Sequence, residues 1–186
     1  MGLGVHSEET LSKSPRVAIT IDDPNLSQSL LLAPKERNRK ILETLERHNL
    51  KAALFVCGSK VDTPAGHQIL KQWHEAGHLM GNHTYSHKYF NSPKMSGNDL
   101  TEDVLRNEKM LGDLIGNPKL LRFPFLKEGE TIEKRDAMRA FLSEHGYRNG
   151  HVTVDASDWY IDGRMCEQIK KEPDADLTPY RDYYLV

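Results

Sequence analysis

The sequence has few cysteines, no long apolar run and almost no net charge. Its 186 residues include two cysteines, Cys57 and Cys166, which form neither a disulfide framework nor a CxxC pair. Cys57 lies in an apolar run, as expected of a small buried residue. No apolar run approaches the roughly 20 residues that a membrane span requires. The formal charge of −2 provides no basic surface of the kind that binds nucleic acid.

The composition is that of a soluble globular domain, with 38% hydrophobic and 28% charged residues. A chain of this length can form one domain with a sizeable core. Residues 1–15 are polar and lack periodicity, and we expect them to form a flexible N-terminal arm. The stretch 1–5 is too short and uncharged for an intact signal peptide, so export would require that a leader has been removed.

Apolar runs and amphipathic segments alternate along the rest of the chain. Short apolar or β-branched runs predict five strands, at residues 16–21, 51–57, 78–82, 119–123 and 151–155. Apolar residues at helical spacing predict helices at about 34–48, 64–76, 98–115, 132–145 and 162–171. This alternation with short connections is typical of an α/β fold with a parallel sheet, closed or open, and helices outside it.

Residues suited to chemistry follow four of the predicted strands. They are Asp22, Asp23, His83, His87, Arg122, Asp155, Asp158 and Trp159. The carboxyl ends of parallel strands open onto the same face of the fold, and active sites form there. We therefore expect these residues to converge, although more than a hundred positions separate the first from the last.

The four-residue spacing of His83 and His87 would place both rings on one face of a helical turn. Neutral imidazole is a good ligand for zinc. A lone HxxxH pair in a loop, however, is more often solvated than bound to metal. Asn82 and Thr84 could orient the rings through hydrogen bonds. One added carboxylate would complete a set of two histidines and one acid that leaves positions open for water and substrate.

Asp22 and Asp23 are the candidates for that carboxylate. Adjacent acids repel each other, which a purely structural turn would tend to avoid. One acid could bind the metal while the other acts as the general base. Each candidate also has an ordinary interpretation, since the acids can form a turn and Arg122 can be a surface residue. Trp159 can be a core residue instead of an apolar wall for a sugar.

Four motifs occur in order: T-I-D-D (20–23), G-N-H-T-Y-S-H (81–87), R-F-P-F (122–125) and D-A-S-D-W (155–159). Together they resemble the polysaccharide deacetylases, carbohydrate esterase family 4, over residues 16 to about 160. The segment A-A-L-F-V-C-G (52–58) also resembles that family's second strand. The resemblance implies a distorted (β/α) barrel. It further implies a metal-dependent hydrolase that removes N- or O-acetyl groups from carbohydrates.

The resemblance assigns roles to the matching residues. Asp23, His83 and His87 would hold a divalent metal, usually zinc and sometimes cobalt or nickel. Asp22 would be the general base that activates water, and Arg122 would orient it.

Other roles follow from the same resemblance. The backbone N–H of Phe125, with the metal, would stabilise the oxyanion. Asp158 and Trp159 would line the site and tune the general acid. The partner would be an acetylated carbohydrate, and the protein would be exported, to the periplasm or the cell exterior.

The sequence departs from the family pattern at three places. Pro24-Asn25 replaces the usual Gly-Pro after the first motif, and Phe125-Leu126 replaces Tyr-Gly, which removes a glycine's freedom from that turn. The family's final Leu-x-His segment, the source of its general acid, has no counterpart after Trp159. Five strands also cannot close such a barrel. We therefore expect residues 16–186 to form a deacetylase-type barrel domain that is truncated at its C-terminus.

Two other functions remain open at this point. The chain could be a non-catalytic carbohydrate- or metal-binding module on the same scaffold, or a hydrolase of the C–N bond of a small amide.

None of the other histidines replaces the missing general acid. His78 begins the third predicted strand, at the end opposite the candidate ligands, and we expect it to bind no metal.

Overall fold

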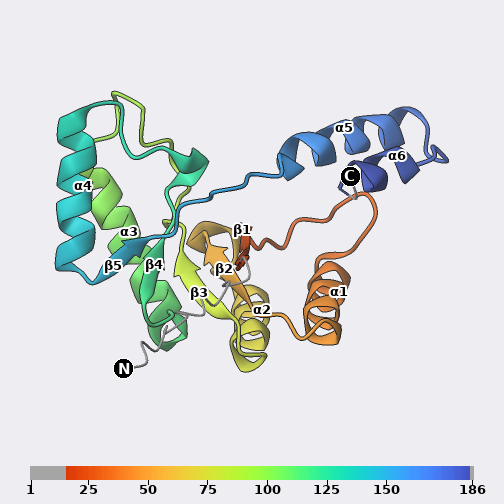
Figure 1. Cartoon of the computed structure of the whole chain (residues 1–186), viewed down its shortest axis with the longest axis horizontal. Coiled ribbons are helices and arrows are strands. Elements are labelled where there is room, and N and C mark those ends of the chain that lie inside the picture. Colours follow the sequence, from red (N-terminus) through yellow and green to blue (C-terminus); the bar gives the residue numbers. More distant parts are fainter. Residues whose placement is uncertain (1–15, 185–186) are drawn as a thin grey trace, which may run out of the picture.

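The computed structural model describes residues 16–184, so the expected arm, residues 1–15, lies outside the described part. Within residues 16–184, five strands form one sheet in the order β1-β2-β3-β4-β5 (Figure 1). Their bounds are Ile19–Asp22 (β1), Ala52–Val56 (β2), Leu79–Asn82 (β3), Lys119–Leu121 (β4) and Tyr147–Asn149 (β5). Every neighbouring pair is parallel. Strand order that follows chain order is how a (β/α) barrel is built.

A helix connects each strand to the next. The helices are α1 (Pro34–Arg47), α2 (Pro64–Glu75), α3 (Gly97–Leu111) and α4 (Ile132–Glu144), followed by α5 (Asp158–Lys171) and α6 (Thr178–Tyr183). Short 3₁₀ turns occur at Gly58–Lys60 (η1), Gly112–Leu114 (η2) and Pro124–Leu126 (η3). In residues 16–184, no helix combines the length and apolarity needed to span a membrane.

Two apolar clusters attach these helices to the sheet. One cluster joins β1, β2 and β3 to α1 and α2, with Leu54, Val56, Leu70, Trp73 and Met80 among its buried members. The other joins β4 and β5 to α3 and α4, with Leu100, Val104, Leu121, Met138 and Leu142. Each such side chain contributes about 1.5–3 kcal/mol when removed from water. Cys57 is also fully buried, as its apolar surroundings predicted.

The fifth strand lies earlier in the chain than predicted. β5 covers Tyr147–Asn149 and pairs with β4, whereas residues 151–155 form no strand. Gly146 has φ +71° and turns the chain out of α4 directly into β5, where Tyr147 is buried. Val154, which made the later segment look like a strand, is 84% exposed. His151 therefore does not begin a strand.

The last two helices lie apart from the sheet. Residues 150–157 cross from β5 to α5 in an extended path, and α5 and α6 lie on the side of the molecule where α1 is found (Figure 1). α5 begins at Asp158, earlier than the predicted residue 162, and α6 was not predicted. The hydroxyl of Tyr180 donates to Gln168 Oε1 at 2.6 Å and ties the two helices together.

Candidate metal and hydrolase site

The carboxyl ends of β1, β3 and β4 bring most of the candidate residues together. Asp22 is the last residue of β1, and His83 follows the last residue of β3. Arg122 follows β4, whose residue Leu121 pairs with Asn82 of β3. The parallel register thus sets side by side residues that are far apart in the sequence.

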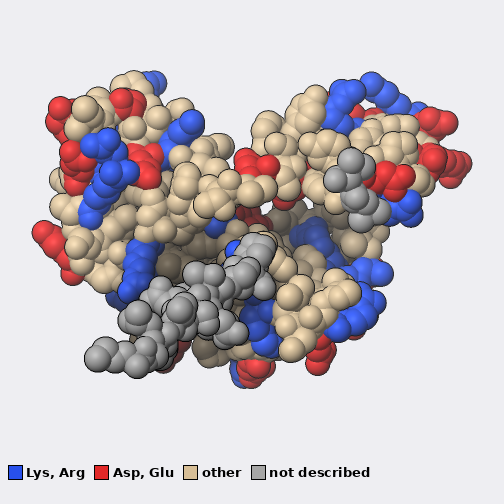
Figure 2. Space-filling model, in the orientation of Figure 1, with Lys and Arg blue, Asp and Glu red and all other residues tan. Residues whose placement is uncertain are grey.

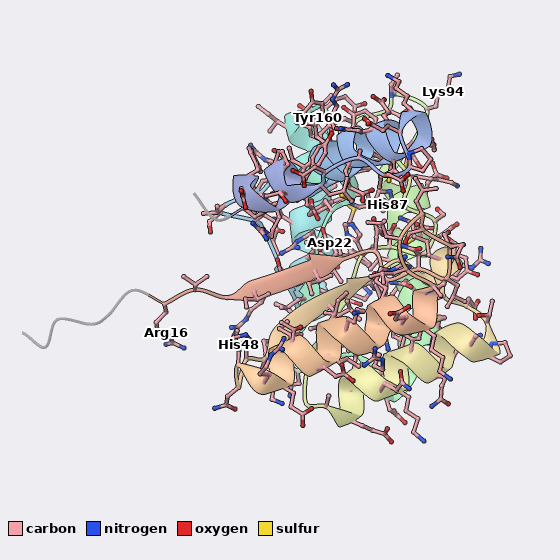
Figure 3. All side chains as sticks on the ribbon, turned by 90° about the vertical axis from the view of Figure 1, so that its right-hand side faces the viewer. Arg16, Asp22, His48, His87, Lys94 and Tyr160 are labelled. Carbon is pink, nitrogen blue, oxygen red and sulfur yellow. The ribbon has the colours of Figure 1, made fainter. Side chains whose placement is uncertain are left out.

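Asp23, His83 and His87 form one compact group of potential metal ligands. Each offers one ligand atom, and these atoms all lie within 4.8 Å of one another. His87 Nε2 lies 3.2 Å from Asp23 Oδ2, and the two imidazole rings meet edge to face with centroids 5.0 Å apart. In the view of Figure 3, Asp22 and His87 are seen through the opening between α1 (orange) and α5 (blue).

His83 is held in the form that binds metals. Its Nδ1 lies 2.8 Å from the carbonyl oxygen of Arg122, and a carbonyl can only accept, so Nδ1 carries the proton and Nε2 keeps a free lone pair. Nε2 lies 3.8 Å from Asp22 Oδ2. Burial lowers the pKa of His83 and favours the neutral imidazole. A histidine oriented by a backbone carbonyl through its other nitrogen is a recurrent feature of metal sites.

One carboxylate oxygen of Asp23 has no hydrogen-bond partner among the described residues. This oxygen is Oδ1, and it is buried. Oδ2 contacts His87 Nε2 at 3.2 Å and Lys60 Nζ at 2.9 Å. Burial raises the pKa of Asp23, but the hydrogen bonds from His87 and Lys60 outweigh it and bring the pKa to about 2. An ionised carboxylate with a bare buried oxygen is costly, and a divalent cation would satisfy it.

This donor set suits zinc. Two imidazole nitrogens and one carboxylate oxygen are a combination found in catalytic zinc sites, where three protein ligands leave a position open. The Asp23 carboxylate is ionised at neutral pH, and burial favours the neutral imidazole of His83, as ligation by these two residues requires. The residues present therefore fit the metal that the family resemblance implies.

Arg122 fixes the second carboxylate, Asp22. Its Nη1 donates to Asp22 Oδ1, and its Nε donates to the Gly150 carbonyl at 2.7 Å. The guanidinium lies 3.9 Å above the centre of the Phe55 ring, and the side chain is only 3% exposed. These contacts leave Arg122 little freedom, and they hold Asp22 with its other oxygen toward His83.

The Phe55 ring beneath Arg122 occupies a slot between two glycines. A Cβ added at Gly81 would lie 2.6 Å from the ring, and one at Gly150 would lie 2.4 Å from it. Because the two glycines have no side chain, the Phe55 ring fits between them and supports the Arg122 guanidinium. Phe55 and Gly81 lie in segments that resemble the family, but sequence reasoning assigned them no role, and it did not single out Gly150.

Asn82 is the centre of a buried polar network behind His83. Its Nδ2 donates to the carbonyl of Val104 at 3.0 Å and to the hydroxyl of Tyr147 at 2.9 Å. Its Oδ1 accepts from the N–H of Thr84 at 2.9 Å and from Nδ2 of Asn107 at 2.8 Å. Every hydrogen-bonding position of this amide is used. Asn107 lies on the apolar face of the predicted helix 98–115. A polar amide at such a position indicates a buried hydrogen-bond network, and sequence reasoning missed it.

The segment 83–87 is a bend and not the helical turn considered from its spacing. Thr84 and His87 have φ of +61° and +54°, and Asp23 has φ of +57°. The Thr84 hydroxyl accepts from the His87 N–H at 3.1 Å. The left-handed backbone therefore makes the two rings converge. Such conformations cost about 1–3 kcal/mol each and cluster at functional sites.

The turn at Phe125 is strained in the way that the missing glycine suggested. Phe125 and Leu126 both have φ of +57°, a region that favours glycine. The Phe125 ring meets the His87 ring edge to face, with centroids 4.8 Å apart. Among the described residues, the Phe125 N–H donates to no acceptor, whereas the Leu126 N–H donates to the carbonyl of Phe123 at 3.0 Å.

Asp158 and Trp159 lie in the first turn of α5 and not at the end of a fifth strand. They line a cavity of about 780 Å³ whose wall also includes Asp22 and Asp23. Figure 2 shows the molecule hollowed between the α5–α6 part and the rest. Trp159 is 71% exposed, so its indole lies at the rim and not in a core.

His78 lies at the opposite end of β3, as expected. It precedes the strand, is buried, and its Nδ1 accepts from the Ala52 N–H at 3.2 Å. Its ring centroid lies 4.9 Å from that of Trp73. The imidazole therefore has a structural role in joining β2, β3 and α2.

A family model described as polysaccharide deacetylase matches residues 11–150. The chain belongs to the polysaccharide deacetylase family. This confirms the resemblance inferred from the four motifs. The barrel-type fold is confirmed as well, because solved structures of the same family match it.

Three relatives illustrate the similarity. The chain is 32% identical to a peptidoglycan-N-acetylglucosamine deacetylase of Bacillus cereus over 145 residues, which are 77% of this chain and 46% of the relative. A solved peptidoglycan N-acetylglucosamine deacetylase is 28% identical with a TM-score of 0.59, and the match covers 77% of this chain and 59% of that one. A mutant of a CE4 family pseudoenzyme with restored enzymatic activity is 25% identical with a TM-score of 0.60, over 77% of this chain and 46% of that one. This chain spans about half the length of these relatives.

Proposed function

We propose that this protein is a metal-dependent deacetylase that hydrolyses acetyl groups of a polysaccharide, with polymers of N-acetylglucosamine such as peptidoglycan as the favoured substrates. The observation that carries the proposal is the grouping of Asp23, His83 and His87, whose ligand atoms lie within 4.8 Å of one another, together with the buried Oδ1 of Asp23 that has no hydrogen-bond partner among the described residues. The peptidoglycan deacetylases among the relatives support the substrate class. Because peptidoglycan lies outside the cell membrane, we also propose that the protein is exported.

Asp23, His83 and His87 would hold the metal, with zinc favoured and cobalt or nickel as alternatives. The bound ion would polarise the acetyl carbonyl and lower the pKa of water. Asp22 would accept the proton of the attacking water, which its ion pair with Arg122 and the 3.8 Å between its Oδ2 and His83 Nε2 support.

Other groups would act on the acetyl group, the departing amine and the sugar. The N–H of Phe125 is available to donate to the carbonyl oxygen as it becomes negative. The departing amine needs a proton, and Asp22 can return the one that it has accepted. The exposed rings of Phe125 and Trp159 offer apolar surfaces for the methyl group or a sugar face.

Acetate release from N-acetylglucosamine oligomers and from peptidoglycan tests the proposal. The full chain is first dialysed against a chelator, and Zn²⁺ is then restored. We expect activity to disappear and return, and the His87→Ala variant to lose about 10²-fold or more in kcat/KM, because a missing ligand disrupts the metal. His48→Ala, an exposed histidine at the end of α1, is the matched control and should keep full activity. Activity that survives both the chelator and His87→Ala would contradict the proposal.

A second candidate function is a non-catalytic binding module on the same scaffold. The observation that favours it is that one of the similar solved structures is a reactivated mutant of a CE4 family pseudoenzyme, so the same fold also occurs in proteins described as pseudoenzymes. The strained turn of Phe125 and Leu126 adds support, because it changes the loop that would carry the oxyanion donor. Saturable binding to peptidoglycan without acetate release, in the presence of Zn²⁺, would establish this function instead.

A further inference from the structure

A lysine lies against the one carboxylate of the proposed metal site. Lys60 Nζ is 2.9 Å from Asp23 Oδ2, the oxygen that His87 also contacts. The lysine side chain is 35% exposed, so the pair is partly shielded from water. Without a metal, the ammonium supplies the positive charge that compensates the carboxylate.

The turn η1 is anchored so that Lys60 stays beside the site. The Gly58 N–H donates to the Thr84 carbonyl at 3.2 Å, and the Ser59 N–H donates to the Tyr85 carbonyl at 2.8 Å. A Cβ at Gly58 would lie 2.5 Å from Asn107 Oδ1, so the turn approaches α3 more closely than another residue would allow. Lys60 is therefore carried by a turn bonded to the same segment, 83–87, that carries both histidines.

The charges of the site balance before any metal binds. Asp22 is paired with Arg122, and Asp23 is paired with Lys60. A divalent cation at Asp23 would add two positive charges beside the ammonium. Like charges a few ångströms apart repel each other, more strongly where water is partly excluded.

We propose that Lys60 competes with the metal for Asp23 and thereby weakens the affinity of the site for divalent cations. This inference rests on the proposed metal-dependent function. The competing hypothesis is that Lys60 strengthens metal binding, because a hydrogen bond to a ligating carboxylate commonly orients the ligand. Asp23 needs little such help, because its backbone N–H already donates to the Phe55 carbonyl at 3.0 Å and anchors the residue at the end of β1. Lys60 also brings a full charge along with its hydrogen bond.

The Zn²⁺ affinity of the full chain distinguishes the two roles. It is measured at neutral pH by competition with a chromophoric chelator. Lys60→Met keeps the length of the side chain and removes the charge, and we expect it to bind Zn²⁺ about tenfold more tightly or better. Lys60→Arg keeps the charge and should stay close to wild type. Lys71→Met, which removes an exposed lysine paired with Glu75 on α2, should change nothing.

The order of the unfolding temperatures with and without Zn²⁺ provides a second readout, because the loss of a merely structural lysine would lower the unfolding temperature in both conditions. In chelator, Lys60→Met should unfold at a lower temperature than wild type, because Asp23 loses its partner. In saturating Zn²⁺ the order should reverse, because tighter binding stabilises the folded state more. Equal or weaker Zn²⁺ binding by Lys60→Met would overturn the inference and leave the proposed function standing. Absence of Zn²⁺ binding in wild type and variant alike would overturn both.

Discussion

Replacing Asn82 by leucine should remove the support of the bend that carries the histidines. Leucine has a similar volume, so the substitution tests the hydrogen bonds and not the packing. The amide of Asn82 makes four hydrogen bonds, and Thr84 and Asn107, which donate to its oxygen, are both fully buried. After the change, the Thr84 N–H and one N–H of Asn107 would have no acceptor.

The expected loss follows from these two orphaned donors. A buried donor without a partner costs about 1–3 kcal/mol, so two of them should lower the free energy of unfolding by about 2–6 kcal/mol. Domains are stable by only about 5–15 kcal/mol, so the effect is large. For a chain of this length, each kcal/mol of lost unfolding free energy lowers the melting temperature by about 2–4 °C. A decrease of roughly 5–20 °C should result.

Urea unfolding followed by circular dichroism measures this loss. The experiment is done in chelator, so that changes in metal binding do not enter. Asn98→Leu makes the same substitution at an exposed position in the first turn of α3, and it should change the stability by no more than about 0.5 kcal/mol. If Asn82→Leu were as stable as that control, the network would not support the site in the way described here.

Four further results are expected. Tyr147→Phe removes the hydroxyl that donates to Glu108 and accepts from Asn82 Nδ2, so it leaves a buried donor without a partner and should cost about 1–3 kcal/mol in urea unfolding. Burial, together with the Glu108 carboxylate, raises the pKa of Tyr147, so the unfolded chain releases this proton first. The stability of wild type should therefore fall as the pH rises above about 10, and it should fall less in Tyr147→Phe, whereas equal slopes would contradict this. Gly81→Ala should cost about 1–3 kcal/mol by displacing the Phe55 ring, and Phe55→Leu in the same chain should recover part of it. Arg122→Met should lower kcat for acetate release at least about tenfold with little change in KM, and an unchanged kcat would argue against its role in placing Asp22.

Much of the arrangement could be predicted from the sequence because it depends on local patterns. Apolar periodicity located α1 to α4, and polar residues after apolar runs marked the carboxyl ends of β1, β3 and β4. Parallel topology then implied that Asp22, His83 and Arg122 would meet, and the structure brings them together.

The remaining features depend on tertiary contacts that no local pattern reveals. β5 is set by the turn at Gly146 and the burial of Tyr147, whereas Val154 in the predicted strand 151–155 is exposed and Val152 is only half-buried. The pairing of Lys60 with Asp23 joins two different loops, and it has no signature in either segment alone. The bend at 83–87 requires positive φ at Thr84, which a β-branched residue rarely adopts without support from its surroundings.

Metal content tests the central claim most directly. The full chain is purified after exposure to Zn²⁺, passed through a desalting column, and analysed for metal and protein, alongside His83→Ala and the control His48→Ala. The account predicts one Zn²⁺ per chain in wild type and in His48→Ala, and a value near zero in His83→Ala, whose Nε2 is one of the three ligand atoms. Wild type without metal, or equal metal in His83→Ala, would contradict it.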